Sequence, residues 1–431
     1  MKKSVIVFAS AVFAASAFAA QVDRVLVRQQ WPWSSEVRVE YSVSGTTAPA
    51  AVSFAFYDGA TPLTPTDLTA LKGDTAYAGN GMHVVTFDPK ALFGLSDTQQ
   101  FADFKVQITL GEESEAMGDR LYKIVDLDTG KIKDLVRADF YNNKGYGTFE
   151  TNFGVFGSGG WYTSLTNVLV WTGVTNNPIY KTSKIVMRRI AAKDKTFTMG
   201  NSSYTDESPT HSVTLTNDYY LSVFEITQAQ HYKLMNSYGS SMTTGEGHEF
   251  FPAMGKYSGL WGRTENWPAG GHKVTMTKFL LALRNLANGA VPFDFPTEAQ
   301  WEFACRAGTT GQWYTGSTSA GNTDRNRLGV VMGGTGTAPE KVGSYLPNAF
   351  GLYDMYSNAA EFCLDWYASY SETGADETDP VGPANGDKRV IRGAHYSSIY
   401  SAKTHATTWR GGVTTGGGSN LYGCRLWCPA D

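Results

Sequence analysis

The sequence has little charge, few cysteines and no long apolar run after its N-terminus. Charged residues make up 18% of the 431 residues and the formal net charge is −4, whereas roughly 25% charged residues is usual. No basic stripe occurs that could neutralise phosphates, which argues against a nucleic-acid partner. No run after the first twenty residues reaches the roughly 18 apolar residues of a membrane span. This composition favours a neutral ligand surface or none.

The first twenty residues have the layout of a cleaved secretory signal. Two lysines precede an apolar run, and Ala17-Phe18-Ala19 stands at its end. We therefore predict a signal peptide at residues 1–20 and export of the mature chain to the periplasm, the cell surface or the medium. The first cysteine is Cys305, which excludes a lipid-modified cysteine at the cleavage site.

The four cysteines can form two disulfides in an exported chain, with three possible connectivities. Cys424 and Cys428 would lie about 13 Å apart in an extended strand, too far to bond. Cys305 with Cys363 is the preferred disulfide. Buried free thiols are the alternative, and the sequence leaves it open.

Apolar and polar residues alternate through the region 21–110. The run from Val37 to Val43 shows this period of two, and residues 52–56 and 104–108 repeat it. Alternation between turn-rich segments predicts a small β-sandwich of immunoglobulin-like type. Nothing in it suggests chemistry, so a presentation or spacer module is expected.

The rest of the chain is predicted to be a connector followed by a mixed α+β domain. Residues 111–183 are rich in Gly, Asn and Thr, which indicates a loop-rich connector that we leave unassigned. Residues 184–431 combine short strands, long glycine-rich loops and three predicted helices. These helices cover about residues 227–236, 278–287 and 297–307.

The segment from Phe295 to Gly308 carries the clearest local signal of a helix. Thr297 is a suitable N-cap, and Glu298 adds an acid to the first turn. Trp301 and Cys305 stand four residues apart on one face, so we expect a buried helix that ends at Gly308.

Eight short strings, in the same order, resemble the formylglycine-generating enzyme family, also called the sulfatase-modifying factor domain. They are Phe197–Gly200, Glu207–Val213, Glu225–Thr227 with Tyr232, Phe295–Gly308, Pro347–Met355, Asn358–Trp366, Arg389–Gly393 and Gly423–Arg425. The resemblance covers residues 184–431 and implies a variant of the C-type lectin fold. The residues themselves suggest structural roles: Glu302, Glu361 and Asp365 are expected as buried partners of arginines rather than as catalytic acids.

Members that generate formylglycine are, by this resemblance, copper-dependent oxidases that act on a cysteine of a sulfatase. Their two cysteines stand five positions apart, just after the string matched by Arg389–Gly393, and soft thiolates suit Cu(I). Here Ser398 and Lys403 occupy about those positions. We therefore expect neither copper nor oxidase activity. The alternative is a formylglycine-generating or other metal-dependent oxidase acting on protein cysteine.

Other metals are weighed on the same resemblance. Structural calcium in the family would nominate Asn358 and Asn322, since oxygen-rich loops suit this ion. His395 and His405 could contribute to an iron or zinc site. However, no carboxylate occurs between Gly393 and Cys424, so a catalytic metal is not expected.

The segment between Gly393 and Gly423 is rich in Tyr, Ser, Thr, His, Asn, Gly and Trp. That mixture resembles an antibody paratope, and the same fold serves ligand-binding proteins diversified by retroelements. We predict an exported ligand-binding or interaction protein whose partner is a protein or a glycan. The candidate contact residues are Tyr396, Ser398, Tyr400, His405, Thr407 and Trp409. An ordinary loop-rich C-terminus is the alternative to a diversified segment, and a cell-surface or matrix component without a small ligand is a further possible function.

Overall fold

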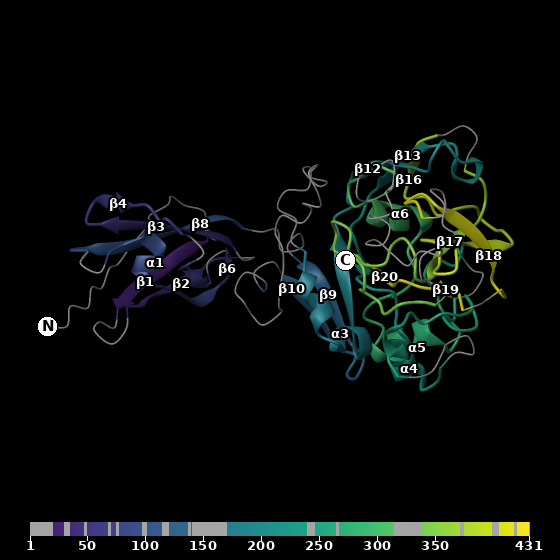
Figure 1. Cartoon of the computed structure of the whole chain (residues 1–431), viewed down its shortest axis with the longest axis horizontal. Coiled ribbons are helices and arrows are strands. Elements are labelled where there is room, and N and C mark those ends of the chain that lie inside the picture. Colours follow the sequence, from purple (N-terminus) through teal and green to yellow (C-terminus); the bar gives the residue numbers. More distant parts are fainter. Residues whose placement is uncertain are drawn as a thin grey trace. The chain divides into compact units, whose positions relative to one another are not determined.

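The structure is a computed structural model that contains two compact units (Figure 1). One comprises residues 1–121 and 135–146, and the other comprises residues 122–134 and 147–431. The described residues are 20–29, 35–46, 50–67, 70–74, 77–96, 101–113, 120–136, 139, 170–238, 246–263, 267–313, 338–370, 375–398, 405–417 and 420–430. The predicted signal peptide therefore lies outside them, apart from Ala20.

The first unit contains two antiparallel sheets. One has the order β1-β2-β7-β5, from β1 (Gln21–Gln29), β2 (Val37–Ser44), β7 (Gly81–Phe87) and β5 (Lys72–Gly73). The other has the order β4-β3-β6, from β4 (Thr61–Leu63), β3 (Ala50–Asp58) and β6 (Tyr77–Ala78), and β8 (Phe104–Glu113) also pairs with β3. A short helix, α1 (Pro89–Phe93), follows β7. The strands predicted from alternation are thus present.

The alternating pattern of β2 directs one set of side chains into the core. Val37, Val39, Tyr41 and Val43 are buried, whereas Arg38 between them is exposed. Phe56, Phe87 and Val106 from other strands belong to the same core. Because side chains alternate along a strand, the residues between the buried positions form the outer face of the sheet.

The second unit is built around three sheets. The largest has the order β10-β9-β11-β14-β20, from β10 (Ile132–Val136), β9 (Arg120–Asp126), β11 (Lys184–Ile190), β14 (Tyr219–Ser222) and β20 (Trp427–Pro429). A second contains β12 (Lys195–Met199), β13 (His211–Leu215) and β16 (Glu377–Thr378). The third has the order β18-β17-β15-β19, from β18 (Arg410–Thr414), β17 (Lys388–Arg392), β15 (Ala360–Trp366) and β19 (Tyr422–Gly423). The region left unassigned from sequence supplies β9 and β10.

The three predicted helices are confirmed as α4 (Gln228–Met235), α5 (Phe279–Leu286) and α6 (Glu298–Arg306). Shorter helical segments are α3 (Ile179–Thr182), η2 (Thr172–Asn176), η3 (Thr205–Glu207) and η4 (His248–Phe250). Thr297 caps α6 as expected, but the helix ends at Arg306, two residues before Gly308, and its C-cap is Ala307 in the left-handed conformation. No helix in the described part of the chain is long and apolar enough to cross a membrane.

Candidate functional site

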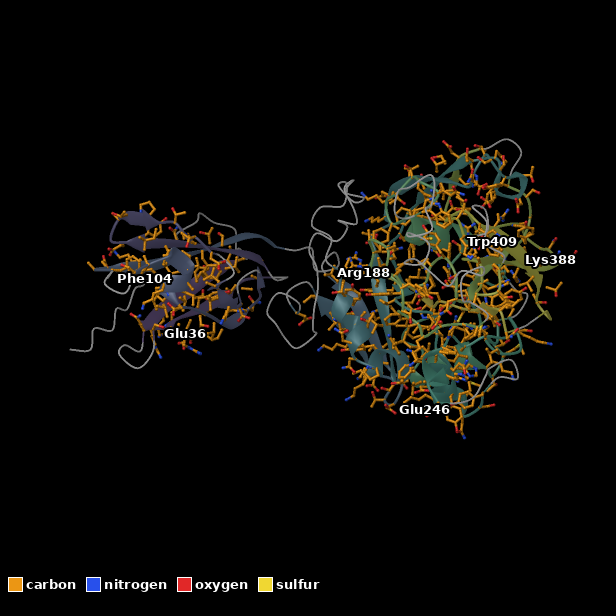
Figure 2. All side chains as sticks on the ribbon, viewed as in Figure 1. Glu36, Phe104, Arg188, Glu246, Lys388 and Trp409 are labelled. Carbon is orange, nitrogen blue, oxygen red and sulfur yellow. The ribbon has the colours of Figure 1, made fainter. Side chains whose placement is uncertain are left out.

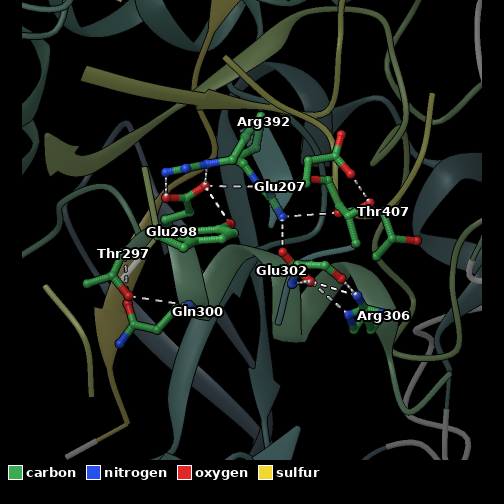
Figure 3. Close-up of polar contacts among 12 residues, drawn as sticks. Glu207, Thr297, Glu298, Gln300, Glu302, Arg306, Arg392 and Thr407 are labelled. Carbon is green, nitrogen blue, oxygen red and sulfur yellow. Dashed lines mark hydrogen bonds and ion pairs between the residues drawn. The ribbon is translucent and has the colours of Figure 1, made fainter. Parts of the chain in front are cut away.

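A buried network of carboxylates and arginines joins α6 to β17, β18 and the segment before β18 (Figure 3). Glu298 accepts two hydrogen bonds from Arg410, each of 2.7 Å. Glu302 accepts from Arg306 at 2.7 Å with one oxygen and from Arg392 at 2.5 Å with the other. Such paired, charge-assisted hydrogen bonds are the strong ones inside proteins.

The start of α6 explains how its acids reach this network. The Thr297 hydroxyl accepts from the backbone N–H of Gln300, and the Gln300 side chain accepts from the backbone N–H of Thr297. This capping box fixes the first turn. Glu298 and Glu302 then lie one turn apart on the same side of the helix. A local sequence signal therefore places two carboxylates where distant arginines can meet them.

The arginines keep Glu302 charged in spite of its complete burial. Burial alone would raise its pKa, but Arg306 and Arg392 outweigh that effect and leave the pKa of Glu302 below its usual value. For the base Arg392 the sign is reversed, since burial alone would lower its pKa. Glu302, Tyr370 and Glu298 raise that pKa, and the net change is a rise. Both groups are therefore ionised at any physiological pH.

The network also fixes the segment that contains several predicted contact residues. Arg392 donates to the backbone oxygens of Thr407 at 3.1 Å and Thr408 at 2.7 Å. The Thr408 hydroxyl donates to Glu207 at 2.7 Å. The Thr407 hydroxyl donates to the backbone oxygen of Gln312 at 2.9 Å. This segment is thus held by the scaffold rather than by its own sequence alone.

The predicted contact residues that the structure describes are mostly interior. Tyr396, Ser398, His405 and Thr407 are all buried. Trp409, labelled in Figure 2, is half-buried and packs against the core of the domain. Tyr400 lies outside the described residues. Of the five predicted contact residues that the structure describes, Trp409 is the only one that is not buried.

Tyr396 and Ser398 are tied to neighbouring parts of the same region. The backbone N–H of Tyr396 donates to the carbonyl of Asn358 at 2.9 Å, and its phenol accepts from Asn420 at 3.1 Å. The Ser398 hydroxyl accepts from the backbone N–H of His395 at 3.1 Å. Asn420 carried no signal in the sequence beyond its position in the polar tail.

Asn358, the expected calcium ligand, is already hydrogen-bonded to protein. Its amide nitrogen donates to Glu225 at 2.7 Å and its oxygen accepts from the backbone N–H of Glu340 at 3.0 Å. The other oxygen of Glu225 accepts from the backbone N–H of Ala359 at 2.7 Å. The amide oxygen of Asn358 has a second lone pair beyond its hydrogen bond from Glu340, and calcium binding at Asn358 stays a prediction. Asn322 lies outside the described residues, and calcium binding there stays a prediction.

His395 and His405, the two histidines considered for an iron or zinc site, lie between β17 and β18. Among the residues that the structure describes, no group of three His, Cys, Asp or Glu side chains gathers as a possible metal-ligand set. His395 is partly exposed, and burial lowers its pKa. His405 is buried. An iron or zinc site at these two histidines would thus have no third ligand of these types in the described part of the chain.

The expected disulfide between Cys305 and Cys363 is not formed. Both are free, buried thiols, as are Cys424 and Cys428. Cys305 and Cys363 lie in one apolar core with Trp301, where a thiol behaves as a small apolar side chain. Burial raises the pKa of both Cys305 and Cys363, so both remain protonated. The alternative of free thiols describes this structure.

The expected pairing of buried acids with arginines is confirmed for two of the three acids. Glu302 binds Arg306 and Arg392, and Glu361 accepts from Arg425 at 2.8 Å. Asp365 instead accepts from the backbone N–H of Glu298 at 2.8 Å, at the start of α6. Burial and the nearby charge of Glu298 raise the pKa of Asp365 to about 7.

Glu225 and its neighbours form a second buried cluster whose role the sequence did not indicate. Burial and nearby acids, Asp354 first, raise the pKa of Glu225 well above its usual range. Arg425 lies beside these acids and donates to Glu361 and to three backbone oxygens, among them that of Tyr353 at 2.6 Å. The only feature of the sequence that pointed to Glu225 was its place in one of the strings that resemble the family.

Residues 186–428 match the family described as the sulfatase-modifying factor enzyme 1-like domain. Among curated proteins, the serine/threonine-protein kinase pkn1 of Chlamydia pneumoniae is 39% identical over 106 residues, or 24% of this chain and 16% of that protein. The formylglycine-generating enzyme of Thermomonospora curvata is 34% identical over 115 residues, or 23% of this chain and 37% of that enzyme. The matched segments thus span well under half of these relatives.

Two solved structures are also similar. Treponema denticola variable protein 1 has a TM-score of 0.47 and 24% identity, over 57% of this chain and 95% of that chain. PvdO from Pseudomonas aeruginosa has a TM-score of 0.44 and 19% identity, over 57% of this chain and 94% of that chain. The family assignment depends on the match at residues 186–428. Because that match covers more than half of the chain, the protein belongs to the sulfatase-modifying factor family.

Proposed function

We propose that the chain is an exported ligand-binding or interaction protein whose sulfatase-modifying factor domain has no oxidase activity. The first unit, which we interpret as an immunoglobulin-like sandwich, would act as a spacer that presents this domain. The observation that carries the proposal is the replacement of the family's cysteine pair by Ser398 and Lys403. A hydroxyl and an amine do not provide the soft ligands that Cu(I) selects.

The surroundings of Ser398 and of three of the four cysteines support the same interpretation. The Ser398 hydroxyl is buried and accepts from a backbone N–H. Burial raises the pKa of Cys305, Cys363 and Cys424, which disfavours the thiolate that a metal site or a nucleophile requires. None of these thiols is suited to replace the missing pair.

Contact with a ligand would then fall to the segment after β17. The arginine network anchors the backbone at Thr407 and Thr408, so the adjoining Trp409 can present an aromatic surface of fixed position. We assign direct contact to Trp409 and Tyr400, and assign Tyr396, Ser398, His405 and Thr407 to holding that surface in place. The partner would be a glycan or a protein, since aromatic and small polar groups suit both.

A binding experiment tests this assignment. The labelled mature chain is applied to a glycan array and a protein array, and the strongest bound component is measured by surface plasmon resonance. We expect Trp409→Ala and Tyr400→Ala each to weaken binding at least about thirtyfold, since truncating a central aromatic contact costs about 2 kcal/mol or more.

Tyr238→Ala is the matched control, because Tyr238 is a 40% exposed tyrosine elsewhere in the same unit. It should leave binding unchanged. Trp409 also packs against the core, so thermal unfolding is recorded for each variant and Trp409→Phe preserves apolar packing. Undiminished binding by folded Trp409→Ala and Tyr400→Ala chains would remove this segment from the binding site.

Copper chemistry provides an independent test. Titration of the mature chain with Cu(I) should give no tight stoichiometric binding, and no oxygen should be consumed with a cysteine-containing sulfatase peptide. The Ser398→Cys/Lys403→Cys variant, which restores two thiols five positions apart, should gain Cu(I) binding. Tight binding and turnover by the unaltered chain would instead establish the oxidase alternative.

A further inference from the structure

Three cations stand at one register across the outer face of the first sheet in the first unit. Arg28 of β1 is paired with Arg38 of β2, Arg38 with Thr86 of β7, and Thr86 with Lys72 of β5. Paired residues of antiparallel strands share a face. Neighbouring strands are about 4.8 Å apart, so the row spans about 14 Å across the sheet.

This face points away from the core of the unit. Val37 and Val39, which flank Arg38 along β2, are buried in that core. The side chains of Arg28 and Arg38 are 58% and 51% exposed, and Lys72 is also exposed. Their charges are therefore accessible to a molecule that lies across the strands.

Glu40 lies beside the row and orients two of its arginines. It forms an ion pair with Arg38 at 2.8 Å and a longer one with Arg28 at 3.9 Å. The hydrogen bond from Arg38, with further contributions from Arg28 and Arg24, holds the pKa of Glu40 below its usual value. The single negative charge of Glu40 therefore does not neutralise the three positive charges of these arginines.

Arg28 lies opposite Arg38 in the pairing of β1 with β2, and Glu40 is the carboxylate that pairs with both. Like charges directly opposite each other destabilise a sheet, and both side chains are mainly in solvent. Other acids flank the row: Glu36, labelled in Figure 2, stands two residues from Arg38, and Asp88 stands two residues from Thr86 and accepts from the Ser35 hydroxyl and the backbone N–H of Lys90. The row itself contains no acid, although the whole chain has a net charge of −4.

We propose that this row, Arg28-Arg38-Lys72, binds a polyanionic polysaccharide. A straight line of exposed cations is complementary to an extended polymer that carries carboxylate or sulfate groups along its length. This inference does not depend on the function proposed for the second unit. The first unit would then attach the protein to an anionic glycan layer rather than act only as a spacer.

Binding of the full mature chain to two immobilised polymers tests the proposal. Heparin is the sulfated probe and polygalacturonate is the carboxylated one. Binding is measured by biolayer interferometry at about 50 to 200 mM salt, because binding to polyanions is salt-sensitive over this range. Arg28→Gln/Arg38→Gln should weaken binding about tenfold and reduce the salt dependence. Glu40→Gln, which removes the opposing charge, should strengthen binding.

Lys193→Gln/Lys195→Gln is the matched control, since it removes two exposed cations from the second unit. It should bind like the unaltered chain. The side chains of Arg28, Arg38, Lys193 and Lys195 are exposed and that of Glu40 is partly buried, so thermal unfolding is recorded to confirm that each variant folds. Any of three results would overturn the proposal. The two double variants could lose binding equally, or the unaltered chain could bind neither polymer. The third is binding confined to anionic phosphatidylglycerol vesicles.

Discussion

Replacing Arg392 by methionine should lower the free energy of unfolding by about 3–5 kcal/mol, because removing one partner of a buried ion pair leaves an uncompensated charge. Arg392 is fully buried, and its guanidinium contacts Glu302 at 2.5 Å and Glu298 at 3.5 Å. It also holds the backbone oxygens of Thr407 and Thr408. Chemical denaturation followed by tryptophan fluorescence would measure the loss.

Lys388→Met is the control for this substitution, since Lys388 begins the same strand and is exposed. It should change stability by no more than about 0.5 kcal/mol. A double-mutant cycle with Glu302→Gln should show that the two losses are not additive, because the two side chains are in contact. A loss below about 1 kcal/mol for Arg392→Met would mean that the network contributes little to stability.

The helices could be predicted because their signals are local. Thr297 and Gln300 form a capping box within four residues, and Thr227 and Gln230 repeat it at α4. Glu302 of α6 could be named as an arginine partner from residue type alone, whereas Glu298 was expected only as an acid in the first turn of the helix. Which arginine meets which acid could not be predicted. Arg392 lies opposite Glu361 in the β15–β17 pairing yet bonds to Glu302 on α6.

The candidate site could be predicted only in part, since composition does not distinguish surface from interior. Tyr, Ser, Thr and His in the tail suggested a contact surface, yet Tyr396 and Thr407 are buried and bonded to other segments. Asn358 and Glu225 are 133 residues apart in the chain, so their hydrogen bond has no local signal.

The basic row shows the same limit for surface charge. Arg28, Arg38 and Lys72 belong to three different strands and form no cluster in the sequence. Only the register of the sheet brings them into line. The absence of a basic stripe in the sequence therefore did not exclude a basic row on the folded surface.

Raising the pH from 4 to 8 should progressively destabilise the fold through Asp365, by up to about 4 kcal/mol for a pKa shift of roughly three units. Burial and Glu298 raise the pKa of Asp365 from 3.8 to about 7. The folded state therefore holds this proton more tightly than the unfolded state does. The penalty is absent below the unfolded pKa, grows between the two pKa values, and is complete above the folded one.

Asp365→Asn should remove this part of the pH dependence, because an asparagine oxygen can still accept from the backbone N–H of Glu298 without carrying a titratable charge. Denaturant unfolding at several pH values should then give a flatter profile for the variant, and a more stable protein at pH 8. Asp387→Asn, which alters an exposed carboxylate, should keep the slope of stability against pH that the unaltered chain has.

Other buried acids titrate in the same range, and burial raises the pKa of Asp354 to about 6. The difference between the two variants therefore isolates Asp365, and parallel profiles would show that its proton is not coupled to folding.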